Sequence, residues 1–70
     1  MNENQIREKI KNNLIKFRQK RGYTQTELGI LLNKKKTTVA SWEQGRSLPS
    51  VETLFILSCI YNIPINKFFD

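Results

Sequence analysis

The chain has 70 residues, with 12 Lys and Arg against 6 Asp and Glu, which gives a formal net charge of +6 at pH 7. This length allows one small domain, with neither a second domain for a cofactor nor a core that could enclose a deep pocket. His is absent and Cys occurs once, so the commonest acid–base group, the commonest metal ligand and any internal disulfide are missing. We therefore expect no enzyme, no metal and no cofactor, but a basic binding module whose partner is nucleic acid or an anionic membrane.

The distribution of apolar residues argues against the membrane. Residues 1–5 are mostly polar and no apolar run follows, so no signal peptide is expected. The longest apolar region, residues 54–60, is too short to cross a bilayer. Basic residues lie mainly in the first half of the chain and the densest apolar stretch in the second, which disfavours a helix lying on lipid. A cytoplasmic protein is expected, and the single cysteine suits a reducing compartment.

In chain order, the first expected element is a helix whose apolar residues recur at intervals of three and four. Ile6, Ile10, Leu14 and Phe17 share one face of this helix, and Lys and Arg occupy the opposite face. Gly22 follows a basic last turn and supplies the left-handed residue that commonly ends a helix.

Two short helices are expected next. Thr24 and Glu27 fit a capping box that opens the second helix, which ends near Asn33. The third helix covers residues 36–44 and is closed by Gly45.

The last two elements lie in the more apolar part of the chain. Ser50 is the expected N-cap of a fourth helix over residues 51–61. A short final helix or turn runs through Ile65, Phe68 and Phe69. No segment alternates with period two as a strand would, so the sequence predicts an all-α fold of five helices.

The second and third helices, joined by a tight turn, suggest a helix-turn-helix. Residues 34–36 are three consecutive lysines, which oppose the positive dipole of the third helix and therefore do not serve its stability. They can strengthen phosphate binding at this N-terminus, while Thr37, Thr38 and Ser41 can meet base edges in a major groove. A lysine run on its own is usually a solvated face; within this motif we favour contact with DNA.

From Leu14 to Phe69 the chain resembles the Cro/C1-type helix-turn-helix domain of phage repressors and of xenobiotic-response-element-type bacterial regulators. The resemblance implies a compact, five-helix, lambda-repressor-like domain over residues 14–70, with residues 1–13 as an extension that includes the start of the first helix. The matching residues are Leu14, Phe17, Arg18, Gly22, Tyr23, Thr24, Gln25, Glu27, Leu28, Leu32, Thr38, Val39, Trp42, Glu43, Gly45, Arg46, Pro49, Ser50, Thr53, Leu54, Ile63, Phe68 and Phe69.

The resemblance also implies roles by position. The residue that opens the second helix binds a phosphate, the outward residues at the start of the third helix contact bases, and the loop after it contacts the backbone. Arg18 and Glu43 match a structural ion pair of the family, and Trp42 is expected in the core. The expected DNA-contacting residues are Gln25, Lys34, Lys35, Lys36, Thr37, Thr38, Ser41, Gln44 and Arg46.

The sequence departs from the family pattern around the turn. Gly29 stands where Ala is usual, at a cost of about 1 kcal/mol in helix propensity. Lys34 and Lys35 replace the usual apolar residue and Ser, so the third helix lacks its ordinary N-cap.

Ile56, Cys59, Phe68 and Phe69 form a second cluster of interest. They either enlarge the core or form a self-association patch, and we favour the patch because such regulators usually bind DNA as two-fold dimers. The sequence thus predicts a sequence-specific DNA-binding transcriptional regulator, a repressor that binds a palindromic operator on double-stranded DNA as a homodimer. The alternative is an antitoxin or another protein-interaction module that holds a protein partner on the same scaffold.

Overall fold

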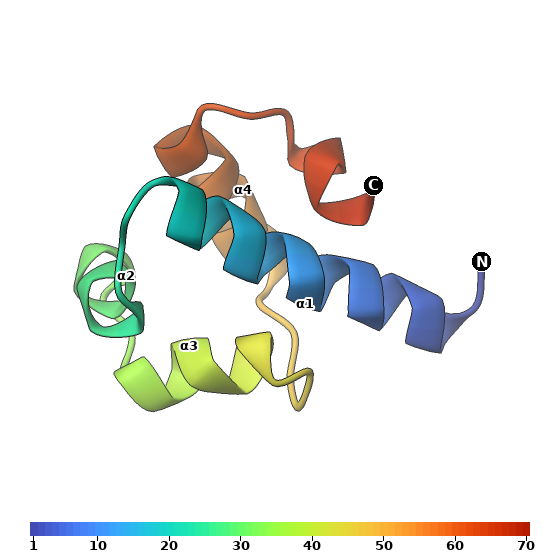
Figure 1. The fold of residues 1–70 in the computed structure, drawn as a ribbon, viewed down its shortest axis with the longest axis horizontal. Coiled ribbons are helices and arrows are strands. Elements are labelled where there is room, and N and C mark those ends of the chain that lie inside the picture. Colours follow the sequence, from blue (N-terminus) through green and yellow to red (C-terminus); the bar gives the residue numbers. More distant parts are fainter.

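The computed structural model describes residues 1–70 and contains helices only. The elements are α1 (Glu3–Lys20), α2 (Gln25–Leu32), α3 (Lys36–Glu43), α4 (Val51–Tyr61) and a final 3-10 helix, η1 (Ile65–Phe69). The all-α fold is thus confirmed, with a 3-10 helix as the fifth element. In Figure 1, α1 crosses the molecule, α3 lies below it and η1 lies above it. None of the helices has both the length and the apolar character of a membrane span.

The helix ends follow the expected local chemistry. Thr24 Oγ1 accepts a hydrogen bond from the Glu27 amide at 3.0 Å, and the Thr24 amide donates to Glu27 Oε1 at 2.8 Å, which completes the capping box. Asn33 ends α2 in the left-handed conformation, with φ of 55°. Ser50 Oγ accepts from the Thr53 amide at 3.1 Å and caps α4. These contacts fix where α2 and α4 begin.

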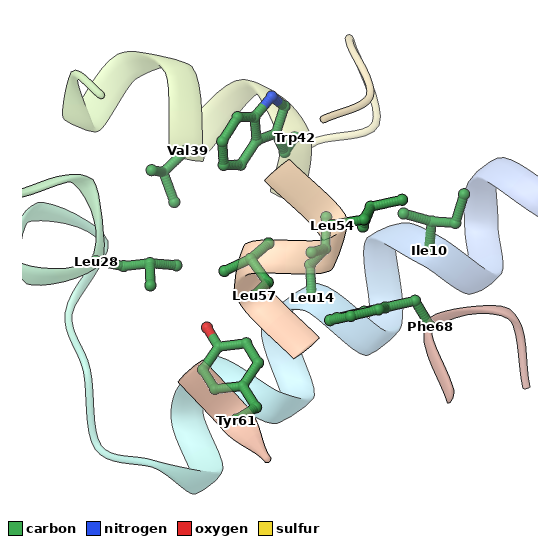
Figure 2. Packing of buried hydrophobic residues seen from close by; sticks show 9 residues of the cluster. All are labelled: Ile10, Leu14, Leu28, Val39, Trp42, Leu54, Leu57, Tyr61 and Phe68. Carbon is green, nitrogen blue, oxygen red and sulfur yellow. The ribbon is translucent and has the colours of Figure 1, made fainter. Parts of the chain in front are cut away.

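The core draws on all five elements, and Figure 2 shows its side chains converging between the helices. The expected domain boundary at residue 14 falls inside the continuous helix α1. Ile10, which precedes this boundary, is also part of the core. Trp42 is only 5% exposed, as expected for a core residue. The buried apolar residues are Ile10, Leu14, Leu28, Val39, Trp42, Leu54, Leu57, Tyr61 and Phe68.

The C-terminal segment folds back on α1. Asn13, which is buried, donates through Nδ2 to the carbonyl oxygens of Phe68 at 3.0 Å and of Asp70 at 3.1 Å. The rings of Phe17 and Phe68 meet edge to face with their centroids 5.7 Å apart. The expectation that Phe68 belongs to an exposed patch is therefore wrong, because its side chain is fully buried against α1.

Candidate nucleic-acid interface

The turn between α2 and α3 is tight because Gly29 has no side chain. The Lys34 amide donates to the Gly29 carbonyl at 2.7 Å. A Cβ at position 29 would lie 2.6 Å from the Lys34 carbonyl oxygen, which is closer than van der Waals contact allows. Glycine at this position, which costs helix propensity, thus permits the backbone approach that sets α3 against α2.

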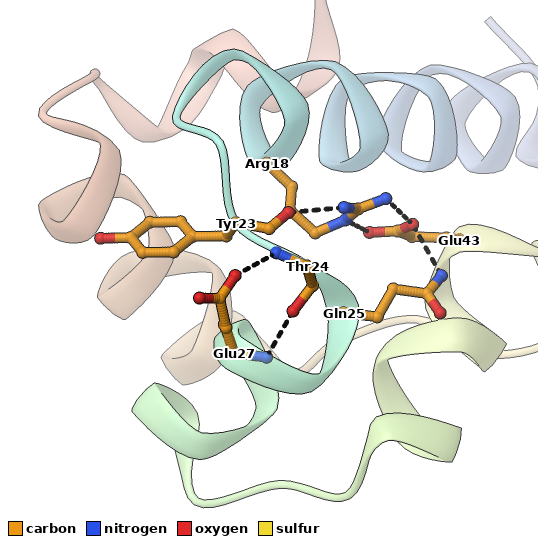
Figure 3. A network of polar contacts seen from close by, with 6 residues as sticks. All are labelled: Arg18, Tyr23, Thr24, Gln25, Glu27 and Glu43. Atoms are coloured by element: carbon orange, nitrogen blue, oxygen red, sulfur yellow. Dashed lines mark hydrogen bonds and ion pairs between the residues drawn. The ribbon is translucent and has the colours of Figure 1, made fainter.

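A buried ion pair fixes the end of α3 to α1. Arg18 donates from Nε to Glu43 Oε2 at 2.7 Å and from Nη2 to Glu43 Oε1 at 3.0 Å, and its Nη1 donates to the Tyr23 carbonyl at 2.7 Å (Figure 3). The two side chains are 12% and 7% exposed. The hydrogen bond that Arg18 donates to Glu43 raises the pKa of Arg18 above its usual value. The pair that the family resemblance implies is therefore present, and it connects α1, α3 and the loop before α2.

Gln25 takes part in the same network. It is the first residue of α2, and its Nε2 donates to Glu43 Oε1 at 3.0 Å (Figure 3). An amide nitrogen carries two hydrogens, so one remains available to an anion beside the start of α2. The expected phosphate contact of Gln25 thus stays a prediction, with the side chain held in place by Glu43.

The first turn of α3 concentrates positive charge on the surface. Lys34, Lys35, Lys36 and Thr37 are all exposed, and none of these lysines takes part in an ion pair. Lys35 occupies the N-cap position without a side-chain hydrogen bond, as the sequence predicts. The amides of this turn are consequently free of a side-chain cap, and three lysines lie beside them in the sequence, an arrangement suited to phosphate.

The remaining predicted contacts differ in how accessible they are. Gln44 and Arg46 are exposed in the loop after α3, whereas Thr38 is half-buried. Ser41 is also half-buried, and its hydroxyl lies 2.8 Å from the Ser47 hydroxyl. Ser41 therefore ties α3 to the following loop, a contact that the sequence did not predict because it depends on how the loop folds back.

Tyr61, the last residue of α4, belongs to the core, and the sequence does not predict it as a site residue. It is 2% exposed and its hydroxyl has no hydrogen-bond partner. Figure 2 shows that hydroxyl pointing into the core. Burial, together with the charge of Glu43, raises the pKa of Tyr61 to about 12.

No three His, Cys, Asp or Glu side chains gather where they could hold a metal ion. What the fold does present is two short helices at a tight turn, with an unpaired cationic surface at the start of the second. These features define a helix-turn-helix DNA-binding domain.

A comparison with protein-family models matches the helix-turn-helix family over residues 14–68, and the chain belongs to this Cro/C1-type family. It is accordingly a DNA-binding transcription regulator. Searches of curated proteins and of solved structures found no match.

Proposed function

We propose that the chain is a repressor that binds a palindromic operator as a homodimer, with α3 in the major groove. The observation that carries this proposal is the surface at the start of α3, where three exposed lysines have no acidic partner. Because the dipole of α3 adds to their charge, this surface suits the phosphate backbone beside a groove that the helix enters.

Residues around α3 supply contacts of two kinds. Gln25 and the exposed loop residues Gln44 and Arg46 flank α3 and hold phosphates, which sets its position on the duplex. Thr37, which is exposed on the first turn, contacts base edges. Repression follows from occupying promoter DNA.

The outer face of α4 is the proposed dimer surface. Val51, Phe55 and Ile56 are 76%, 60% and 48% exposed, and Cys59 is exposed at the end of the same face. Phe69, from η1, is 39% exposed. Apolar side chains gathered on one face in this way usually mark an interaction surface, and a two-fold dimer would place two α3 helices about 34 Å apart for successive major grooves.

Selection of bound sites from a random duplex pool tests the proposal. We expect inverted repeats whose half-sites lie one helical turn apart. Lys36→Gln should weaken binding and make the negative slope of log K against log salt less steep by about 0.9. No enrichment by the wild type, or a salt slope left unchanged by Lys36→Gln, would contradict the assignment.

The dimer is tested separately by sedimentation of the wild type and of Phe55→Ser. We expect a concentration-dependent dimer that the substitution dissociates, with salt-dependent binding to random DNA retained. Enrichment of single half-sites would contradict the homodimer. A stoichiometric partner protein that co-purifies with the wild type and is lost from Phe55→Ser would instead favour the antitoxin or protein-interaction function for this face.

A further inference from the structure

The middle of α1 lies beside the loop that follows α3, and the first turns of α1 extend beyond that loop (Figure 1). The contact is made at Gly45, where an added Cβ would lie 3.3 Å from Lys11 Cδ. The stem of Lys11 therefore runs across the loop at the point where that loop has no side chain. Lys11 and Arg18 are two helical turns apart, so Lys11 lies on the side of α1 that carries the ion pair with Glu43 at the end of α3.

Arg7 extends this side of α1 by one further turn. It precedes Lys11 by four residues, which places the two side chains next to each other on the helix. Arg7 is half-buried and forms no ion pair. Both residues precede residue 14, where the family match begins, so neither belongs to the matched helix-turn-helix.

Within the protein, Lys11 forms only a weak ion pair. Its Nζ lies 3.0 Å from Glu8 Oε2, and the Glu8 side chain is 63% exposed. Lys11 itself is 27% exposed, so solvent reaches both partners. A pair of this kind contributes little, and a phosphate can replace the carboxylate as the partner of Lys11. Arg46 is the exposed residue that follows Gly45, so the loop that Lys11 crosses carries a third cation.

We propose that Arg7 and Lys11, together with Arg46, form a phosphate-binding row by which α1 holds the backbone of the same DNA duplex. The inference rests on the proposed placement of α3 against DNA, because that placement brings the loop and the overlying face of α1 to the sugar-phosphate backbone. Glu8 then sets the strength of this contact, since its carboxylate competes with phosphate for Lys11 Nζ.

Salt titrations of binding to a random-sequence duplex test the row, because phosphate contacts do not depend on sequence. For Lys11→Gln we expect the slope of log K against log salt to become less steep by about 0.9, with affinity lower by about fifteenfold at 50 mM and about fourfold at 200 mM salt. Arg7→Gln should act in the same direction. The matched control is Lys20→Gln, which removes an equal charge from the opposite face of α1, and its slope should equal that of the wild type.

Further variants separate a contact from a general effect of charge or from a folding defect. Lys11→Arg, which keeps the positive charge at this position, should retain the wild-type slope. Glu8→Gln should raise affinity several-fold, whereas Glu52→Gln, which changes the net charge equally from the exposed start of α4, should raise it less. The gain from Glu8→Gln should vanish when Lys11 is already Gln.

The outcomes that overturn the inference are distinct from those that overturn the proposed function. If Lys36→Gln lowers the slope while Lys11→Gln does not, or if Lys11→Gln and Lys20→Gln lower it equally, the row on α1 is refuted and the placement of α3 stands. If the wild type does not bind the duplex, or if Lys36→Gln leaves its slope unchanged, both are refuted.

Discussion

Replacing Glu43 with Gln removes the one carboxylate at the centre of the network between α1, α2 and α3. In the wild type this carboxylate accepts two hydrogen bonds from Arg18 and one from Gln25. The amide of Glu43→Gln keeps the shape of the side chain but has no charge and a single acceptor oxygen. Arg18, only 12% exposed, would then be left without its counter-charge.

The expected loss of stability follows from this burial. Breaking a buried pair on one side costs about 3–5 kcal/mol. Arg18 keeps its hydrogen bond to the Tyr23 carbonyl, which places the expected loss near the lower end, about 3 kcal/mol. At roughly 0.1 kcal/mol per residue, a chain of this size has only about 7 kcal/mol of stability in total, so the substitution should remove close to half of it.

Urea unfolding measures this loss through Trp42, the single tryptophan, which is 5% exposed in the core. With a denaturant slope of about 1 kcal/mol per molar urea, the midpoint of Glu43→Gln should fall by about 3 M. Glu52→Gln, an exposed control with the same charge change, should stay within about 0.5 kcal/mol of the wild type.

Replacing Arg18 and Glu43 together by Met and Leu should cost less than either single substitution, because no charge is then left buried without a partner. A midpoint shift for Glu43→Gln no larger than that of Glu52→Gln would refute the argument from burial.

Three further predictions follow from single contacts. Gly29→Ala should lower the free energy of unfolding, measured in urea, by about 1 kcal/mol, because the clash with the Lys34 carbonyl (about 1–3 kcal/mol) exceeds the helix propensity gained; a rise in stability would contradict the close approach. Lys35→Ser should add an N-cap to α3 and about 1 kcal/mol of stability while lowering the salt slope of DNA binding by about 0.9, and an unchanged slope would remove Lys35 from the interface. Tyr61 should ionise only at about pH 12, as phenolate absorbance reports. Because this pKa is raised in the folded state, Tyr61 contributes about 2–3 kcal/mol to the free energy of unfolding below pH 10, and this contribution is lost as the pH rises from 10 to 12. Ionisation of Tyr61 near pH 10 in the folded protein would refute its burial.

Helix boundaries could be predicted from the sequence because they depend on neighbouring residues. The capping box at Thr24, the left-handed Asn33 and the N-cap at Ser50 each act within one turn of the chain. The place of Phe68 could not be predicted in this way. Its spacing suits a buried or an exposed position equally, and Asn13, far away in the sequence, binds the carbonyls that turn it inward.

The candidate site shows the same division between local and distant causes. The lysines at the start of α3 and the missing cap at Lys35 are visible in the sequence. The pair of Arg18 and Glu43 was expected only from the family resemblance. The hydrogen bond from Gln25 to Glu43 joins residues from two helices whose approach depends on the fold, so no local pattern announces it. From the sequence, Gly29 only lowers helix propensity; its role becomes visible once the Lys34 carbonyl is found next to it across the turn.

The contact between α1 and η1 sets a condition on how the chain folds during synthesis. Phe68 is the core residue furthest along the sequence, and the buried amide of Asn13 donates only to the carbonyl oxygens of Phe68 and Asp70. A growing chain that has reached the end of α4 still exposes the surface of α1 that Phe68 covers and leaves Asn13 without its partners. Because closing this contact joins residues 55 positions apart, it carries a large loop-closure entropy, and we expect it to form late. The core under α1 is therefore completed only after residue 68 has been synthesised, later than the pair of Arg18 and Glu43 that connects α1 to α3.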